Sequence, residues 1–117
     1  MKRLLIVDDE AGIVEEVREY FQEEGFEVHT ADTVRDGILQ LDRVNPDIVV
    51  LDIKLPDQCG LEVLRYAKKS HPSIKVIVNT GYVDQALIDE AEELGRDAFL
   101  QKPFDLERLQ QEISRFL

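Results

Sequence analysis

The sequence has little of several features whose absence narrows its possible functions. Its single cysteine, Cys59, cannot form an intramolecular disulfide. No apolar stretch approaches the roughly 20 residues needed to span a bilayer, and no basic segment leads into a long apolar stretch near the N-terminus. Basic residues are outnumbered, with 14 Lys and Arg against 25 Asp and Glu and a formal net charge of −11. We therefore expect a cytoplasmic protein with no direct contact to nucleic acid or membrane surfaces, which are themselves anionic.

A glycine-rich phosphate-binding loop is also missing. The first apolar run, Leu4–Val7, is followed by three acids, Asp8, Asp9 and Glu10, where a nucleotide carrier would have a GxxxxGK or similar segment. This argues against a flavin or nucleotide carrier. It also raises the question of why a buried strand should end on so much negative charge.

The composition is that of a folded globular protein. Hydrophobic residues make up 44% of the 117 residues and charged residues 33%, a balance that argues against intrinsic disorder. A chain of this length buries enough surface to form its own core. We expect a single domain spanning 1–117.

Apolar runs of strand length alternate with segments whose apolar residues recur at helical spacing, which predicts five strands and five helices. Thr33 and Asp105 are expected to cap the helices that they precede, and Gly25 and Gly95 to release the chain after a helix. Runs such as DIVVLD are apolar on both faces, which is typical of a parallel sheet covered by helices on each side. We predict an α/β fold with an open, doubly wound sheet. The expected strands are Leu4–Val7, Glu27–Ala31, Ile48–Leu51, Ile74–Val78 and Ala98–Gln101.

Reactive side chains follow most of these strands. In an open α/β sheet, ligands bind beyond the carboxyl ends of the strands, where this sequence has Asp8 with Asp9, Asp52, Thr80 and Lys102. If the first and third strands are neighbours, their carboxylates repel each other, which raises some of their pKa values and favours a divalent cation. Mg²⁺ suits these oxygen ligands, and no His or Cys at this edge favours a softer metal.

Each of these residues also has an ordinary structural interpretation. Asp9 and Glu10 could complement the positive end of the following helix. Asp52 could be a polar residue that ends a strand, Lys102 a surface lysine and Thr80 a helix or turn cap. Their joint position at the carboxyl ends of the strands favours the functional interpretation.

Four motifs, in order along the chain, resemble those of the receiver domain of two-component response regulators. They are IVDDE, VVLDIKLPDQCGLEVL, VIVNTGY and FLQKPFD, and the resemblance runs from Lys2 to Leu117. It implies a flavodoxin-like (βα)5 fold, with a doubly wound five-stranded parallel sheet in the strand order 2-1-3-4-5. It is similar in particular to the single-domain receivers of phosphorelays.

The resemblance implies a phosphoacceptor function. Asp52 would accept a phosphoryl group from a phosphohistidine on a histidine kinase or histidine phosphotransfer protein. Asp8, Asp9, Asp52 and the backbone carbonyl of Lys54 would bind Mg²⁺. The chain would catalyse its own phosphorylation and dephosphorylation without a substrate that it turns over many times.

Further roles implied by the resemblance concern the groups around the phosphoryl site. Lys102 would pair with the phosphoryl oxygens, and the Lys102-Pro103 bond would be cis. Thr80 would donate a hydrogen bond to a phosphoryl oxygen, and Phe99 would be the aromatic switch residue, with a core aromatic as the alternative. Gly60 would let the loop after the acceptor turn tightly.

Two positions are expected to tune the lifetime of the acyl phosphate. Lys54 and Tyr82 match positions from which a side chain can obstruct the attacking water. His29 and His71 are expected to be surface residues, because the sequence shows no carboxylate or second histidine arranged around either of them.

Apolar residues near the rim are candidates for docking the phosphohistidine protein, with burial of Ile13 and Phe104 as the alternative. Because the chain shows no effector domain, we expect a downstream phosphotransferase or effector to be a separate molecule, or the chain to derive from a longer regulator. The docking candidates are Ile13, Pro56, Pro103 and Phe104.

Two other functions remain open at this point. A metal-dependent phosphatase or hydrolase could use the same carboxylates, although Lys54 occupies the position of the second aspartate that aspartate-based phosphatases have. A degenerate receiver could act as an interaction module alone, which the intact set of site residues disfavours.

Overall fold

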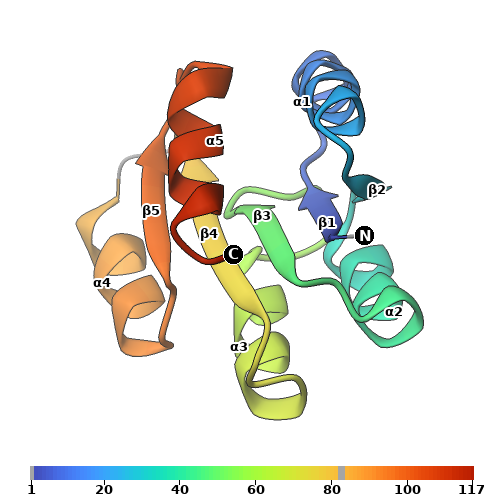
Figure 1. The fold of residues 1–117 in the computed structure, drawn as a ribbon. Coiled ribbons are helices and arrows are strands. Elements are labelled where there is room, and N and C mark those ends of the chain that lie inside the picture. Colours follow the sequence, from blue (N-terminus) through green and yellow to red (C-terminus); the bar gives the residue numbers. More distant parts are fainter. Residues whose placement is uncertain (1, 82–83) are drawn as a thin grey trace.

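The computed structural model describes residues 2–81 and 84–117 as a five-stranded parallel sheet in the order β2-β1-β3-β4-β5 (Figure 1). This is the flavodoxin-like fold and the strand order that the sequence resemblance implied. The order reverses between β1 and β3, so the carboxyl ends of these neighbouring strands form the edge at which ligands bind in open α/β sheets. The strands are β1 (Arg3–Val7), β2 (Glu27–Ala31), β3 (Ile48–Asp52), β4 (Lys75–Thr80) and β5 (Ala98–Gln101).

Helices cover both faces of the sheet, with α1 and α5 on one face and α2, α3 and α4 on the other (Figure 1). None of the described helices is long and apolar enough to cross a lipid bilayer. The helices are α1 (Ala11–Glu23), α2 (Val34–Val44), α3 (Leu61–Ser70), α4 (Gln85–Glu93) and α5 (Leu106–Ser114).

The strands lie where the apolar runs predict them, with differences at their ends. The third strand extends one residue beyond the predicted end to include Asp52, and the fourth runs from Lys75 to Thr80 instead of Ile74–Val78. Parallel pairing explains the extension, since Asp52 lies opposite Asn79 in the β3–β4 ladder. Ile74 instead closes the preceding turn, and its amide donates to the carbonyl of His71 at 3.0 Å.

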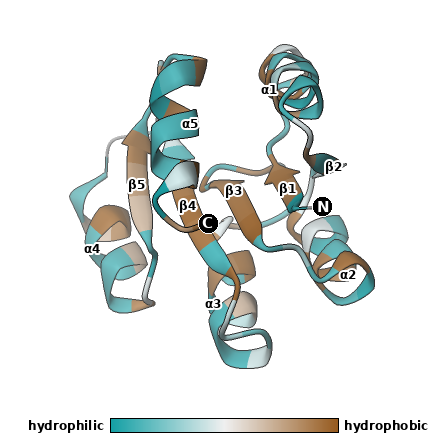
Figure 2. Ribbon diagram, in the orientation of Figure 1, coloured by the Kyte–Doolittle hydropathy of each residue, from teal (hydrophilic) through white to brown (hydrophobic). Residues whose placement is uncertain are grey.

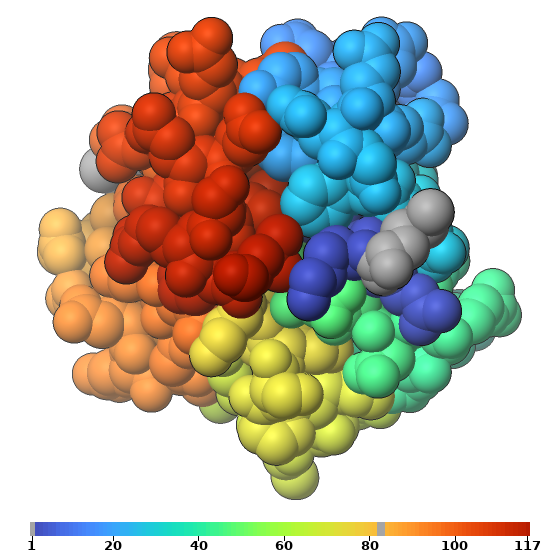
Figure 3. Space-filling view, in the orientation of Figure 1, coloured from blue at the N-terminus to red at the C-terminus, as the bar shows by residue number. Residues whose placement is uncertain are grey.

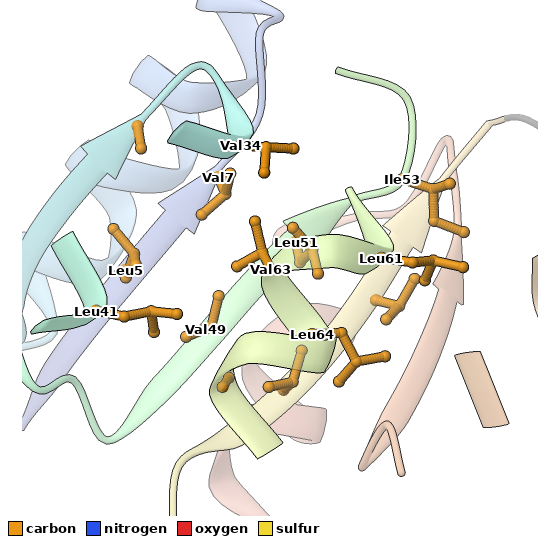
Figure 4. Packing of buried hydrophobic residues seen from close by; sticks show 14 of the residues in the cluster. Leu5, Val7, Val34, Leu41, Val49, Leu51, Ile53, Leu61, Val63 and Leu64 are labelled. Carbon is orange, nitrogen blue, oxygen red and sulfur yellow. The ribbon is translucent and has the colours of Figure 1, made fainter. Parts of the chain in front are cut away.

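The central strand β3 is buried along its entire length and divides the core into two clusters. Val49 and Leu51 belong to the cluster under α2, α3 and α4, and Figure 4 shows them near Leu41 and Val63. Ile48 and Val50 belong to the cluster under α1 and α5. The hydrophobic residues of β1, β3 and β4 in Figure 2 reflect this burial on both faces. Because burying one such side chain contributes about 1.5–3 kcal/mol, β3 helps to hold the two layers of helices together, as do β1 and β4, whose residues also occur in both clusters.

The helix boundaries follow the predicted signals. Thr33 accepts a hydrogen bond from the amide of Asp36, and Asp105 accepts one from the amide of Arg108, so both residues cap their helices. Gly25 and Gly95 have φ angles of 94° and 92°, the left-handed conformation that glycine adopts most easily.

The expectation for the histidines was wrong in one respect. Each has a carboxylate beside it: Nε2 of His29 lies 2.7 Å from Oε2 of Glu27, and Nε2 of His71 lies 2.8 Å from Oδ1 of Asp42. The second contact joins α2 to the turn after α3. The sequence did not reveal it, because the partners lie 29 residues apart.

The first and last helices lie side by side. Figure 3 shows the blue N-terminal and red C-terminal parts of the chain in contact on one face of the molecule. Gln110 of α5 links them, because it accepts a hydrogen bond from Tyr20 Oη at 2.5 Å and donates one to Oε1 of Glu24 at 3.0 Å. This packing places the segment after β5 next to the start of α1.

Candidate functional site

An acidic cleft lies at the carboxyl ends of the central strands. Asp8 directly follows β1, and Asp52 ends β3, which pairs with β1 through Val7 and Leu51. Asp8 is 2% exposed and Asp52 is 4% exposed. Buried carboxylates require a compensating positive charge. In this cleft the charge comes from a residue near the other end of the sequence.

The compensating charge is Lys102, whose side chain is 9% exposed. Its Nζ donates to Asp8 Oδ2 at 2.8 Å and to Asp52 Oδ2 at 3.1 Å. It also donates to Glu10 Oε1 at 2.7 Å. Two acids near the start of the chain, the aspartate in its middle and the late lysine therefore form one hydrogen-bonded cluster.

Burial and charge have opposing effects on these groups. Burial is the main cause that raises the pKa of Asp8, and the hydrogen bond from Lys102 offsets only part of this effect. Burial alone would lower the pKa of Lys102, but the hydrogen bonds to Asp8 and Glu10 and the charge of Asp52 raise it well above its usual range. The lysine is therefore a permanent cation at neutral pH.

The third partner of Lys102 was not identified from the sequence. The side chain of Glu10 was interpreted as a possible complement to the positive end of the next helix. In the structure it makes no capping hydrogen bond to α1 and instead reaches Lys102, 92 residues away. The only sequence signal was its place as the third acid of the IVDDE motif.

The donor set of the cleft fits a hard divalent cation. Among the described residues, carboxylate oxygens of Asp8, Glu10 and Asp52 lie within 4.8 Å of one another. Asp9 is exposed and lines the same cleft. All these donors are oxygens, the ligand type that Mg²⁺ prefers, and the position of the Lys102 ammonium group shows that the cleft attracts positive charge.

The remaining predicted residues of the cleft lie around Asp52. Lys54 and Pro56 are exposed at the rim, Thr80 is buried at the end of β4, and all three line a cleft of about 450 Å³ with Asp9 and Asp52. The amide of Lys54 donates to Asp52 Oδ1 at 3.3 Å. Tyr82, the other residue predicted to tune the phosphoryl lifetime, lies outside the described residues.

The loop that follows Asp52 needs a glycine at Gly60, as expected from the sequence, and the reason is the close approach of two backbone segments. Gly60 has φ −59° and ψ −20°, angles that any residue can adopt. A Cβ at this position would lie 2.0 Å from the backbone oxygen of Asp52 and 2.9 Å from Cα of Ile53. The glycine therefore permits the loop to pack directly against the end of β3.

Two further expectations concern the end of β5. The Lys102-Pro103 bond is cis, as the resemblance implied. Phe99 is half-buried and packs against the cluster that lies under α2, α3 and α4. Its position suits a core aromatic and leaves its switch role a prediction.

Three of the four docking candidates line one groove beside the cleft. Ile13, Pro103 and Phe104 line a groove of about 500 Å³, whose wall also contains Glu10 and Lys102. Ile13 and Phe104 are half-buried and pack against the core below α1 and α5, so their burial is confirmed in part and their docking role stays a prediction. Pro56 lies apart from this groove, at the rim of the acidic cleft.

Comparison with known proteins decides the family. The family model described as "Response regulator receiver domain" matches residues 4–114. The chain belongs to this family. Receiver domains act in two-component and phosphorelay signalling, where they exchange phosphoryl groups with histidine kinases or phosphotransfer proteins and act on downstream effectors.

Individual relatives match over very different shares of their own length. The receiver is 35% identical to sporulation initiation phosphotransferase F of Bacillus subtilis over 99% of this chain and 94% of that protein. It is 38% identical to the luminescence regulatory protein LuxO of Vibrio campbellii over 89% of this chain, but spans only 23% of that protein.

The fold of the receiver is also found in solved structures. The crystal structure of a CheY-like response regulator receiver domain protein from Methanospirillum hungatei JF-1 has a TM-score of 0.96 at 34% identity, covering 98% of this chain and 92% of that one. The family as a whole generally binds Mg²⁺, in agreement with the oxygen donors of the cleft.

Proposed function

We propose that Asp52 is the phosphoryl acceptor of this receiver and that it takes the group from a phosphohistidine on a histidine kinase or histidine phosphotransfer protein. The observation that supports this most strongly is the contact of Lys102 with both Asp8 and Asp52, which gathers acceptor, metal ligands and a fixed cation in one cleft. An oxygen of Asp52 would form the new bond to phosphorus while the phosphorus–nitrogen bond of the donor breaks. The imidazole nitrogen keeps the bonding pair and takes a proton from water.

The chain's own groups would align the reactants and offset their charge, which is most of what phosphoryl transfer requires. Lys102 would donate to the phosphoryl oxygens, and Thr80 would donate through its hydroxyl group. Asp8, Asp9, Asp52 and the carbonyl of Lys54 would hold Mg²⁺. When bound, the ion supplies positive charge that reduces the repulsion between the acceptor carboxylate and the anionic donor.

The partner surfaces follow from the same site. The groove beside the cleft would receive an apolar helix face of the phosphohistidine protein, through Ile13, Pro103 and Phe104, with Pro56 contacting it from the rim. Phosphorylation adds about −1.5 to −2 units of charge. Thr80 and Phe99 would respond to this charge and change the surface of α4, β5 and α5 for a downstream phosphotransferase or effector.

The lifetime of the phosphoryl group would depend on Lys54 and Tyr82. Lys54 is exposed at the rim of the cleft that contains Asp52, from where its side chain can block the path of an attacking water. We expect slow loss of the phosphoryl group from the wild type. A Lys54→Asn variant should lose it faster, and an unchanged rate would contradict this role.

The acceptor is tested by incubation with Mg²⁺ and acetyl phosphate followed by intact mass measurement. The wild type should gain the mass of a single phosphoryl group, whereas Asp52→Ala should gain none. Addition of a chelator should prevent the gain. Release of inorganic phosphate over many turnovers, without an intermediate on Asp52, would instead support a metal-dependent hydrolase.

A further inference from the structure

Glu10 has no part in the transfer described above, yet it makes the shortest contact to Lys102. It directly precedes α1, where its side chain leaves the capping position unused. By contrast, Thr33, Asp84 and Asp105 each accept a hydrogen bond from the first turn of the helix that they precede. The carboxylate of Glu10 is therefore directed away from its own helix and toward the cleft.

The hydrogen bonds of Lys102 show what Glu10 supplies. An ammonium group has three donor hydrogens, and Asp8, Glu10 and Asp52 each accept one of them, at 2.8, 2.7 and 3.1 Å. In the proposed function Asp8 and Asp52 bind the metal ion, and Asp52 also carries the phosphoryl group. Glu10 is then the carboxylate that stays available to the lysine.

We propose that Glu10 is a positioning residue for Lys102: it keeps the ammonium group in the cleft when Asp8 and Asp52 are engaged elsewhere. This inference rests on the proposed function. The lysine side chain is a flexible four-carbon chain with a strongly hydrated head. A fixed acceptor at its end pre-organises it for the arriving phosphoryl oxygens, which is how enzymes convert positioning into rate.

The position of Glu10 makes it a good target for substitution. Its side chain is 56% exposed, whereas that of Lys102 is 9% exposed, so changes at Glu10 do not open the core. Glu23 offers a matched control, because it is an exposed acid at the other end of the same helix.

The first test compares initial phosphorylation rates at saturating Mg²⁺ with acetyl phosphate as donor. Glu10→Gln should be slower than the wild type by roughly tenfold, less than the roughly hundredfold that a misplacement of 1 Å can cost, because Lys102 keeps its other contacts. Glu10→Asp keeps the charge but shortens the side chain, so it should also be slow, while Glu23→Gln should match the wild type. A Glu10→Asp variant as fast as the wild type would overturn the proposal, because only charge would then matter.

The second test asks whether the effect passes through Lys102. In a double-mutant cycle, Glu10→Gln should slow phosphorylation in the wild-type background but cause no further slowing in the Lys102→Met background. Because Lys102→Met itself reacts slowly, its phosphorylation is followed over longer times. The free energy of unfolding of the same four proteins is also measured by urea denaturation, in the presence of Mg²⁺ and without a phosphodonor. There, Glu10→Gln should lower the stability of the wild type but not that of Lys102→Met.

The outcomes separate the two proposals. Equal slowing in both backgrounds, or no slowing of Glu10→Gln, overturns the role of Glu10 and leaves the acceptor role of Asp52 intact. A wild type that gains no phosphoryl group on Asp52 overturns the proposed function and, with it, the role of Glu10.

Discussion

At the scale of single residues, the position of the loop after β3 depends on contacts between residues that lie far apart in the sequence. Asp57 accepts hydrogen bonds from the amides of Val34 at 2.9 Å and Arg35 at 3.1 Å, at the start of α2. These bonds hold the pKa of Asp57 below its usual range. The loop that follows Asp52 is thereby attached to a neighbouring helix.

This depressed pKa predicts acid sensitivity. Because the pKa of Asp57 is lower in the folded than in the unfolded state, its stabilising effect is present above the unfolded pKa of about 4 and is lost as the pH falls through the folded pKa. Asp57→Ala should therefore have a lower melting temperature than the wild type at pH 7, and this difference should shrink below about pH 4. Thermal melts over this pH range measure it; a difference that is independent of pH would contradict the argument.

Gly60 provides a second prediction at this scale. Gly60→Ala should lower the free energy of unfolding by about 3 kcal/mol, because the added Cβ overlaps backbone atoms that have little freedom to move. Gly12→Ala is the control, since a Cβ there meets nothing within 4 Å and alanine favours a helix. Urea unfolding of both variants should give opposite signs, and equal stabilities would argue against the close packing at Gly60.

At the scale of the elements, α2 shows how local and distant groups complete one helix. The first helical amides have no partner within a helix. Thr33 accepts two of these bonds, from the amide of Asp36 through Oγ1 and from the amide of Gly37 through its carbonyl. The carboxylate of Asp57 accepts the bonds from the two preceding amides, those of Val34 and Arg35. The start of α2 therefore depends partly on its own sequence and partly on the loop after β3.

The local part is open to a direct test. Thr33→Ala should lower the free energy of unfolding by about 1 kcal/mol, because it removes the acceptor for the amide of Asp36. Arg35→Ala serves as the control, since the hydrogen bond of Arg35 to Asp57 comes from its backbone amide. Chemical denaturation measures both, and an equal loss in the two variants would show that the cap is not the cause.

At the scale of the whole molecule, several of the acids lie close together in the cleft, where carboxylate oxygens of Asp8, Glu10 and Asp52 are within 4.8 Å of one another. The chain carries a formal net charge of −11, and its buried carboxylates Asp8 and Asp52 each accept a hydrogen bond from Lys102. Like charges at close range destabilise the folded state. A cation that binds only the folded chain should therefore stabilise the entire domain.

We expect Mg²⁺ to raise the melting temperature. At a concentration 100 times its dissociation constant, the ion should add about 2.7 kcal/mol to the free energy of unfolding. Asp52→Asn should show a much smaller rise, because it lacks one anionic ligand. Glu23→Gln, with the same change in charge on a distant surface, should respond like the wild type. Differential scanning calorimetry at constant ionic strength tests this, and an equal rise in all three proteins would indicate general screening of charge.

The sequence by itself determined the elements and most of the candidate site. Alternating apolar runs, together with the cap at Thr33, predicted the strands and helix ends because such signals depend on neighbours along the chain. Asp8, Asp52 and Lys102 could be assigned to one edge because each follows a strand, and parallel strands end at a common edge. The strand order itself came from the family resemblance, since periodicity carries no information on which strands pair.

Only the tertiary structure decided which distant groups touch. The pairing of β1 with β3 brings Asp8 to Asp52, and the packing of α1 beside α5 brings Glu10 to Lys102 over 92 residues. The attachment of Asp57 to α2 and the close approach at Gly60 likewise depend on how the loop lies on its neighbours. Such contacts are set by the packing of the whole core, which no local pattern in a single sequence encodes.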